Sequence, residues 1–291
     1  MKGNKIKRNC LFISFLFAIL FSSAVSLSAQ DAAISWTQKI DWEKNELTLT
    51  LETALDQSGP NRPAATIAAE RKIDTALPRI FSEAFLTFQI DSTRVFKESI
   101  ENGDFPVAEL LNIAVTGKKS LPSYSHDLQR LSINYTYKLY DLLANYFVLH
   151  QQPLSVTRYI PWIPTREYTG IVIYAKGSLP VHGERFSSSL VPCLFPEIFD
   201  SQMNPLMLFT MGDPVYLKKW GSAAYTTSFD ETPWAERIGN RPLHIIATGL
   251  YGKYPTDLKI PEESAAQIMA NPQNRRLLAE GRVLIIFDAD K

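Results

Sequence analysis

The sequence TGIVIYA at residues 169–175 is a continuous apolar run, and it decides the predicted fold of the second half of the chain. Two later runs have the same character, LHIIAT at residues 243–248 and RVLIIFD at residues 282–288. Unbroken apolar runs of this length are typical of strands that are covered on both faces. A helix pattern at residues 261–270 lies between the last two runs, so the region predicts a small α/β subdomain with a mixed sheet.

The first half of the chain has a different pattern. Residues 35–55 carry leucines in alternation with Thr and Glu, which predicts a half-buried strand in a hairpin that turns near Lys44 and Asn45. Residues 128–140 alternate in the same way and predict a second strand. Residues 90–96 are interpreted as a further strand, followed by a short helix.

Two helices are predicted among these strands. In residues 64–88 apolar side chains recur at spacings of three and four, as on one face of a helix, and Pro78 is expected to kink that helix or divide it in two. Residues 142–148 are apolar on most sides and predict a short helix. The predicted fold class is therefore α+β, with an N-terminal strand–helix–strand subdomain followed by the small α/β subdomain.

Composition divides the chain into four segments. We expect a signal peptide at residues 1–29, an N-terminal α+β subdomain at residues 30–150 and a C-terminal α/β subdomain at residues 168–291. Residues 151–167 contain several prolines and predict the connection between the two subdomains.

The signal peptide is predicted from its three-part pattern. A basic stretch at residues 2–8 is followed by an apolar run at residues 10–27 and then by small residues up to Ala29. Export to the periplasm or another part of the cell envelope follows. An uncleaved N-terminal anchor stays open, because the run is near the lower limit of length for spanning a bilayer. Cys10 precedes the run instead of following it, so no lipid attachment is expected.

The net charge limits the classes of binding partner, and the cysteine count limits the possible disulfides. The full chain has 30 basic and 30 acidic residues, and residues 1–29 contain no acidic residue, so the mature chain is net acidic. This argues against nucleic acid and anionic lipid as main partners. After signal cleavage Cys193 is the only cysteine, so an internal disulfide is excluded and a small buried side chain is the expected role.

One motif superficially suggests a zinc deaminase. His182 and Glu184 are followed by Pro192 and Cys193, as in the H-x-E and P-C-x-x-C signature of those enzymes. Pro196 occupies the position of the second metal-binding cysteine and cannot bind zinc. The sequence therefore predicts no zinc site, and a surface loop beside a buried thiol explains the same residues.

Other catalytic patterns are incomplete. Ser178 and Ser222 lack the flanking glycine of a nucleophile elbow, and residues 249–253 are too short for a phosphate-binding loop. Asp288 and Asp290 are interpreted as the solvated end of the last strand. No catalytic, cofactor-binding or metal-binding residue is predicted, and no cofactor. The four histidines are interpreted as core or surface residues: His126, His150, His182 and His244.

The order of motifs in the second half carries a family resemblance. The motifs are YTGIVIYAKG (168–177), PCLFPEIFD (192–200), GSAAY (221–225), RPLHIIATG (241–249), TDLKIPEESAAQI (256–268) and RVLIIFD (282–288). This order resembles the C-terminal domain of FlgT-like proteins, the family of the flagellar H-ring assembly protein. Tyr174 stands where that family often has Asp, and residues 179–190 lengthen the first loop. The alanine-rich helix and the sequence QIDSTRVF (89–96) are similar to related envelope lipoproteins.

The resemblance implies a structural or assembly role without catalysis. We therefore expect a non-catalytic periplasmic protein that acts through protein contacts in cell-envelope or flagellar-motor assembly, with envelope or flagellar basal-body proteins as partners. No transmembrane segment is expected after signal cleavage. Two alternatives remain open. A periplasmic small-molecule binding protein would have a deep apolar pocket with convergent polar groups, and a hydrolase would hold two titratable side chains within hydrogen-bond reach in a cleft.

Overall fold

The computed structural model describes residues 34–56, 62–155 and 163–289. The predicted signal peptide, part of the Pro-rich connection and Asp290 lie outside the described residues. The described residues belong to one compact unit. Within the described residues, no helix is both long enough and apolar enough to cross a bilayer.

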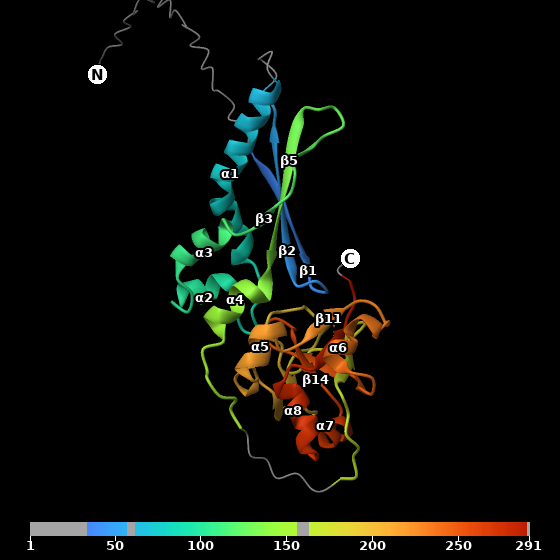
Figure 1. Ribbon diagram of the computed structural model, residues 1–291. Coiled ribbons are helices and arrows are strands. Elements are labelled where there is room, and N and C mark those ends of the chain that lie inside the picture. Colours follow the sequence, from blue (N-terminus) through green and yellow to red (C-terminus); the bar gives the residue numbers. More distant parts are fainter. Residues whose placement is uncertain (1–33, 57–61, 156–162, 290–291) are drawn as a thin grey trace, which may run out of the picture. The chain divides into compact units, whose positions relative to one another are not determined.

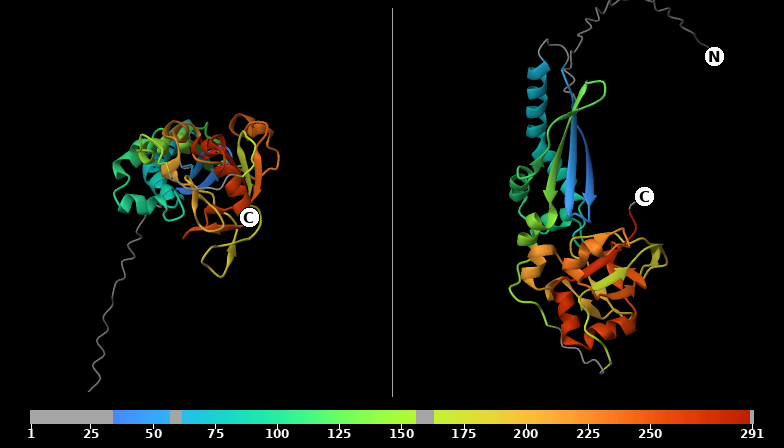
Figure 2. Two further views of the ribbon diagram at one scale, coloured as in Figure 1. Left: turned by 90° about the horizontal axis from the view of Figure 1, so that it is seen from below. Right: turned by 45° about the vertical axis from the view of Figure 1, so that its right-hand side comes forward.

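The first half is built on an antiparallel sheet. Strands β1 (Ser35–Asp41), β2 (Glu46–Ala54) and β5 (Arg130–Lys138) pair in that order. Helix α1 (Arg62–Leu86) lies along one face of these long strands, and the turned view shows the same arrangement (Figures 1 and 2). The leucines of β2 are buried under this helix while the alternating Thr and Glu side chains are only partly buried, which confirms the predicted hairpin.

Helix α1 continues through Pro78 without a break, so Pro78 does not divide the helix in two, and the alternative of a kink stays a prediction. Buried side chains lie on either side of the proline, among them Ile73, Leu77 and Phe81. The packing of this apolar face against the sheet holds both halves of the helix in register, which outweighs the backbone hydrogen bond that proline cannot donate.

The predicted strand at residues 90–96 is also wrong. The segment is a tight loop with one isolated bridge between Gln89 and Val95. The Asp91 carboxylate accepts hydrogen bonds from the backbone N–H groups of Thr93 and Arg94, at 2.9 and 3.1 Å. Aspartate bonding to the backbone two residues later favours a turn over a strand.

Short elements complete the first half. Helix α4 (Leu139–Phe147) confirms the short helix predicted at residues 142–148. Helices α2 and α3 occupy the region where one short helix was predicted, and two short strands pair with β5. The remaining elements are α2 (Phe96–Glu101), α3 (Val107–Ala114), β3 (Lys118–Lys119) and β4 (Ser123–Tyr124).

The three apolar runs form strands of one sheet in the second half, which is parallel throughout where a mixed sheet was predicted. Its order is β11 (Ala224–Thr226), β15 (Val283–Ile286), β6 (Ile171–Tyr174) and β12 (Leu243–Ile246), and all neighbours are parallel. β15 is buried throughout and β6 nearly so, as expected for central strands. β12 is an edge strand, which corrects the expectation that it is covered on both faces. Ile246 is 72% exposed.

A smaller mixed sheet and several helices surround the parallel sheet. The mixed sheet has the order β10 (Pro205–Met207), β9 (Ile198–Phe199), β14 (Asp257–Lys259) and β13 (Gly249–Tyr251). Helix α7 (Glu262–Met269) confirms the helix predicted at residues 261–270 and lies beside α8 (Pro272–Ala279) (Figure 1). The other elements are α5 (Pro214–Trp220), α6 (Ala235–Ile238), a hairpin of β7 (Leu179–Pro180) and β8 (Ser187–Ser188), and 3-10 turns at Phe209–Met211 and Thr232–Trp234.

Candidate functional site at the junction of the two halves

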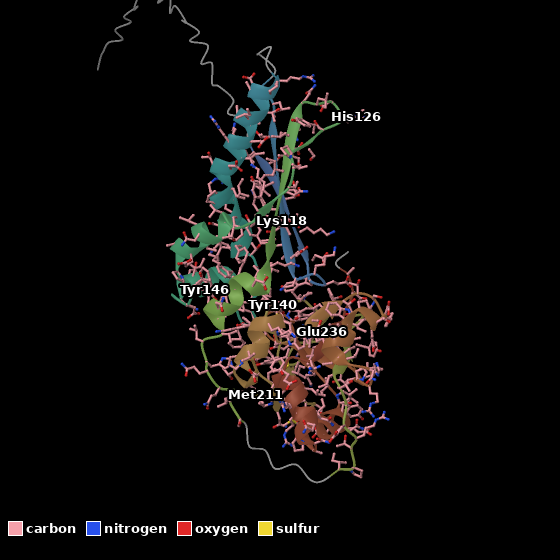
Figure 3. The ribbon with its side chains drawn as sticks, viewed as in Figure 1. Lys118, His126, Tyr140, Tyr146, Met211 and Glu236 are labelled. Atoms are coloured by element: carbon pink, nitrogen blue, oxygen red, sulfur yellow. The ribbon has the colours of Figure 1, made fainter. Side chains whose placement is uncertain are left out.

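The two halves meet at a buried tyrosine. Tyr140 lies on α4, where Figure 3 labels it. Its hydroxyl donates to the carbonyl oxygens of Leu194 and Ala223, at 3.3 and 3.2 Å. A side chain at Gly221 would overlap the Tyr140 ring, and the φ of +77° at Gly221 also favours glycine. The ring and the glycine together fit α4 against the second half.

The turn between β1 and β2 makes a second contact with the second half. The Trp42 ring stacks on Phe88 and meets Tyr225 edge-on, with ring centroids 5.5 Å apart in each pair. The Glu43 carboxylate accepts hydrogen bonds from the Thr226 hydroxyl at 2.6 Å and the Thr227 backbone at 2.9 Å. The first-half hairpin therefore binds the end of β11.

Cys193 is buried in this junction, which confirms its expected role. The Tyr225 hydroxyl accepts from the Cys193 backbone N–H at 3.2 Å and donates to the Cys193 carbonyl at 3.1 Å. Burial, together with the nearby charge of Asp257, raises the pKa of the Cys193 thiol well above its ordinary value. A protonated buried thiol is a poor nucleophile, so the geometry gives Cys193 a packing role.

The other members of the apparent zinc motif lie on the surface. His182 is exposed and its Nδ1 lies 3.1 Å from the Lys259 ammonium. Glu184 is exposed in the adjacent turn, whereas Cys193 is fully buried. Across residues 34–56, 62–155 and 163–289, no three His, Cys, Asp or Glu side chains gather as metal ligands would.

Asp257, at the start of β14, is a fully buried carboxylic acid. Its Oδ1 accepts hydrogen bonds from the Glu197 backbone N–H at 3.1 Å and from the Thr256 hydroxyl at 3.2 Å. No group within the described part of the chain bonds Oδ2 with hydrogen-bond geometry. Burial raises the pKa of Asp257 to about 7, against a smaller opposing effect of the Ser92 side chain.

A cavity of about 150 Å³ lies beside Glu197, between segments of the two halves. Glu197 Oε1 accepts one hydrogen bond, from the Phe209 backbone N–H at 3.3 Å. Burial raises the pKa of Glu197, and the charge of Asp91 adds to this effect. The walls of the cavity are formed by Asp91, Ser92, Thr93, Arg94, Phe147, Phe195, Glu197 and Phe209.

The cation in that wall is already paired. Arg94 donates from Nε to Asp91 at 2.8 Å and from Nη1 to Asp104 at 2.6 Å. Two carboxylates thus offset the guanidinium of Arg94. Glu197 has no cationic partner at this distance among the bonds described, so carboxylates outnumber cations around the cavity.

A second polar cluster lies on the outer face of the parallel sheet. Both carboxylate oxygens of Glu231 lie within 3.1 Å of His244 Nε2, and the Tyr174 hydroxyl donates to Glu231 at 3.1 Å. Burial and the bond to Glu231 raise the pKa of Tyr174. The His244 side chain is 47% exposed.

An apolar groove of about 670 Å³ lies at the far end of the first half, where α1 begins and β5 starts. Ile67 is 52% exposed and Leu128 is 46% exposed. The Thr66 and Tyr124 hydroxyls lie 3.3 Å apart and join the helix to β4. We call this feature the tip groove. Its walls are formed by Leu55, Asp56, Arg62, Pro63, Ala65, Thr66, Ile67, Tyr124 and Leu128.

The other residues that the sequence analysis considered for a site lie far apart in the structure. His126 lies on the β4–β5 loop (Figure 3), and His150 bonds the Gly212 carbonyl at 2.8 Å. Asp288 accepts from the Gly177 backbone N–H at 2.6 Å, which ties the end of β15 to the loop after β6. No pair of these residues forms a joint site among the described positions.

The cavity at the junction could hardly be predicted from sequence patterns. Its aromatic walls come from positions far apart in the chain, Phe147, Phe195 and Phe209. Glu197 was part of the PCLFPEIFD motif but was not singled out. A glutamate between apolar residues in that motif was the one feature that could have drawn attention to it.

Comparison with family models identifies relatives of both halves. Residues 33–145 match the model of the Treponema pallidum Tp0624 N-terminal domain, and residues 170–289 match that of the Tp0624 second domain. The resemblance to FlgT-like proteins is therefore wrong: it rested on the order of short apolar strands, which many parallel sheets share. A search of curated proteins found no match. The chain is thus similar, in the same order and over both of its halves, to the first two domains of Treponema pallidum Tp0624.

Proposed function

We propose that the protein is a non-catalytic component of the cell envelope that acts by binding another envelope protein. The observation that carries the proposal is the tip groove, an apolar recess with exposed Ile67 and Leu128 on the rim of an otherwise packed half. An exposed apolar surface with a polar rim is characteristic of protein-binding sites. Asp56 and Arg62 supply polar groups to this rim.

The packing of α1 further along the helix supports the same function. Helix α1 is anchored to the sheet by fully buried side chains, among them Ile73, Ile80 and Phe81. A groove on such a frame changes little when a partner binds, so less binding energy is lost in ordering it. The occupant that we propose is an apolar segment of the partner that places a large side chain between Ile67 and Leu128.

Cross-linking in cells tests the groove. A photoreactive phenylalanine analogue placed at residue 66 is expected to cross-link one defined envelope protein. Adding Leu128→Glu is expected to reduce that product about tenfold or more, because a carboxylate would have to be desolvated in an apolar contact. The measurement is the yield of the cross-linked band, identified by mass spectrometry.

The matched control places the same analogue at residue 50, on the polar side of the sheet. Residue 50 is expected to give no such product. Equal yields at residues 50 and 66, or an unchanged yield with Leu128→Glu, would show that the tip groove does not bind the partner.

Location in the envelope is proposed from the pattern of residues 1–29. We expect N-terminal sequencing of the protein recovered from fractionated cells to show that it begins at Gln30 or Asp31. A chain that still contains residues 10–27 and stays with the membrane would show an uncleaved anchor. Recovery of the intact chain from the cytosol would contradict export altogether.

The cavity beside Glu197 is the observation that favours the small-molecule alternative. Its volume of about 150 Å³ is below the size of most ligand pockets, which begin near roughly 300 Å³. It combines three aromatic side chains with the charged side chains of Asp91, Arg94 and Glu197.

A further inference from the structure

The cavity beside Glu197 has two chemical features, aromatic walls and excess negative charge. The ring centroids of Phe195 and Phe209 are 4.3 Å apart, and those of Phe147 and Phe195 are 5.9 Å apart. The rings therefore line one continuous part of the wall. Aromatic faces attract cations, most strongly where water is excluded.

The charged groups that face the cavity select a positive ligand. Asp91 and Arg94 neutralise each other through a 2.8 Å ion pair, and Arg94 also bonds Asp104. Glu197 remains, with a single hydrogen bond from a neutral backbone N–H. Asp257 lies behind it, bonded to the Glu197 backbone. An anion would meet repulsion here, and a neutral ligand would leave the carboxylate without a strong partner.

The volume of the cavity limits the size of the ligand. A protein cavity of about 150 Å³ can hold a molecule the size of benzene, that is, about six heavy atoms. An ammonium ion with short alkyl groups has this size. Its charge suits Glu197 and its methyl groups suit the phenyl rings.

We infer that this cavity binds a compact alkylammonium ion, with Glu197 as its counter-ion and Phe147, Phe195 and Phe209 as its aromatic walls. The site is formed by both halves, since residues 91–94 and Phe147 come from the first and Phe195, Glu197 and Phe209 from the second. Occupancy would therefore add contacts across the junction. It would also give the half-buried Glu197 carboxylate the cationic partner that favours its ionised form.

Calorimetric titration of the full-length chain, held in an uncharged detergent, tests the inference. Tetramethylammonium chloride is the probe, tert-butanol is the neutral probe of similar shape, and sodium chloride keeps the ionic strength constant. Tetramethylammonium is expected to bind saturably with one site per chain, and tert-butanol is not. Glu197→Gln is expected to weaken binding about tenfold or more, because it removes the charge and keeps the shape.

Two further variants make the result specific. Glu184→Gln removes an exposed carboxylate outside the cavity and is expected to bind as the wild type does. Phe209→Leu keeps Glu197 and removes one ring, and is expected to weaken binding about threefold. It serves as the test if circular dichroism shows that Glu197→Gln does not fold. Absence of saturable tetramethylammonium binding, equal binding of tert-butanol, or unchanged affinity in the folded cavity variants would overturn the inference.

Discussion

Replacing Arg237 by alanine is expected to destabilise the protein by about 3–5 kcal/mol. Arg237, on α6, is buried and donates to three backbone carbonyls. Its Nε bonds Gly281 at 2.7 Å, Nη1 bonds Trp220 at 2.8 Å and Nη2 bonds Gly221 at 2.9 Å. The guanidinium also lies 5.3 Å from the centroid of the Trp220 ring. It thereby fastens the end of α5 to the turn before β15.

The size of the effect follows from what the substitution leaves behind. Three carbonyl oxygens would lose a charged donor in a region that water does not reach, and a cavity would replace the side chain. Burial lowers the pKa of Arg237 to about 10, so the guanidinium stays protonated at neutral pH despite its surroundings. For a chain of this size the midpoint temperature is expected to fall by roughly 10 °C.

Urea unfolding followed by circular dichroism measures this loss. Arg237→Met keeps most of the volume and removes all donors, so it is expected to lose nearly as much stability as Arg237→Ala. Arg237→Lys keeps the charge but cannot reach three divergent carbonyls, and an intermediate loss is expected. Arg185→Ala, at an exposed position, is the control and should change stability by less than about 0.5 kcal/mol. A loss below about 1 kcal/mol in Arg237→Met would contradict the role of these hydrogen bonds.

Arg237 also shows where sequence reasoning stops. Its acceptors are backbone carbonyls at Trp220, Gly221 and Gly281, and no side-chain pattern marks a carbonyl as an acceptor. A single arginine in a short helix has the appearance of a solvated surface residue. Only the fold brings the three carbonyls together, so neither its burial nor its role could be predicted.

The strands could be predicted where the pattern reports burial directly. The runs at β6 and β15 are apolar at every position and proved to be the central strands of the parallel sheet. The run at β12 is also mostly apolar, but this strand lies at the edge of the parallel sheet. The order of strands in a sheet depends on long-range pairing, which composition does not encode. At residues 90–96 the hydrogen bonds that Asp91 accepts from the backbone favour a turn over the predicted strand.

The junction was predictable in one respect. The lone cysteine, Cys193, was expected to be buried, and it is. The carboxylates around it were not recognised, because Asp257 and Glu197 are 60 residues apart and acidic residues are ordinarily solvated. Their proximity is a consequence of the parallel pairing of β9 with β14.

The buried Asp257 carboxylate leads to the second large effect, a change of stability with pH. Asp257→Asn is expected to be more stable than the wild type at pH 8, by up to about 4 kcal/mol. The limit is the free-energy equivalent of a pKa that burial raises from 3.8 to about 7. At pH 8 the wild-type chain holds an ionised, buried carboxylate with one oxygen that lacks a hydrogen bond, and the amide is neutral.

The way the free energy of unfolding changes with pH distinguishes an effect of the Asp257 charge from a general gain in packing. A carboxyl whose pKa is raised by folding contributes stability that is complete below its unfolded pKa and lost as pH rises through its folded pKa. The wild type is therefore expected to gain about 2–3 kcal/mol from this group between pH 8 and pH 5, and Asp257→Asn is not. The neighbouring titratable groups are Glu197, whose pKa is also raised by burial, and Cys193, whose thiol stays protonated throughout.

Urea unfolding at pH 5 and pH 8 measures both quantities, with Glu184→Gln as the exposed control that should follow the wild type at each pH. Asparagine keeps the acceptor that bonds the Glu197 backbone and Thr256, so the substitution changes charge with little change of shape. A stability difference that is the same at pH 5 and pH 8 would mean that Asp257 does not take up a proton in this range. If the stability difference between Asp257→Asn and the wild type becomes smaller toward pH 5, the ionised carboxylate of Asp257 is what destabilises the wild type at higher pH. The other contacts of residue 257 are the same in the two proteins and do not change with pH.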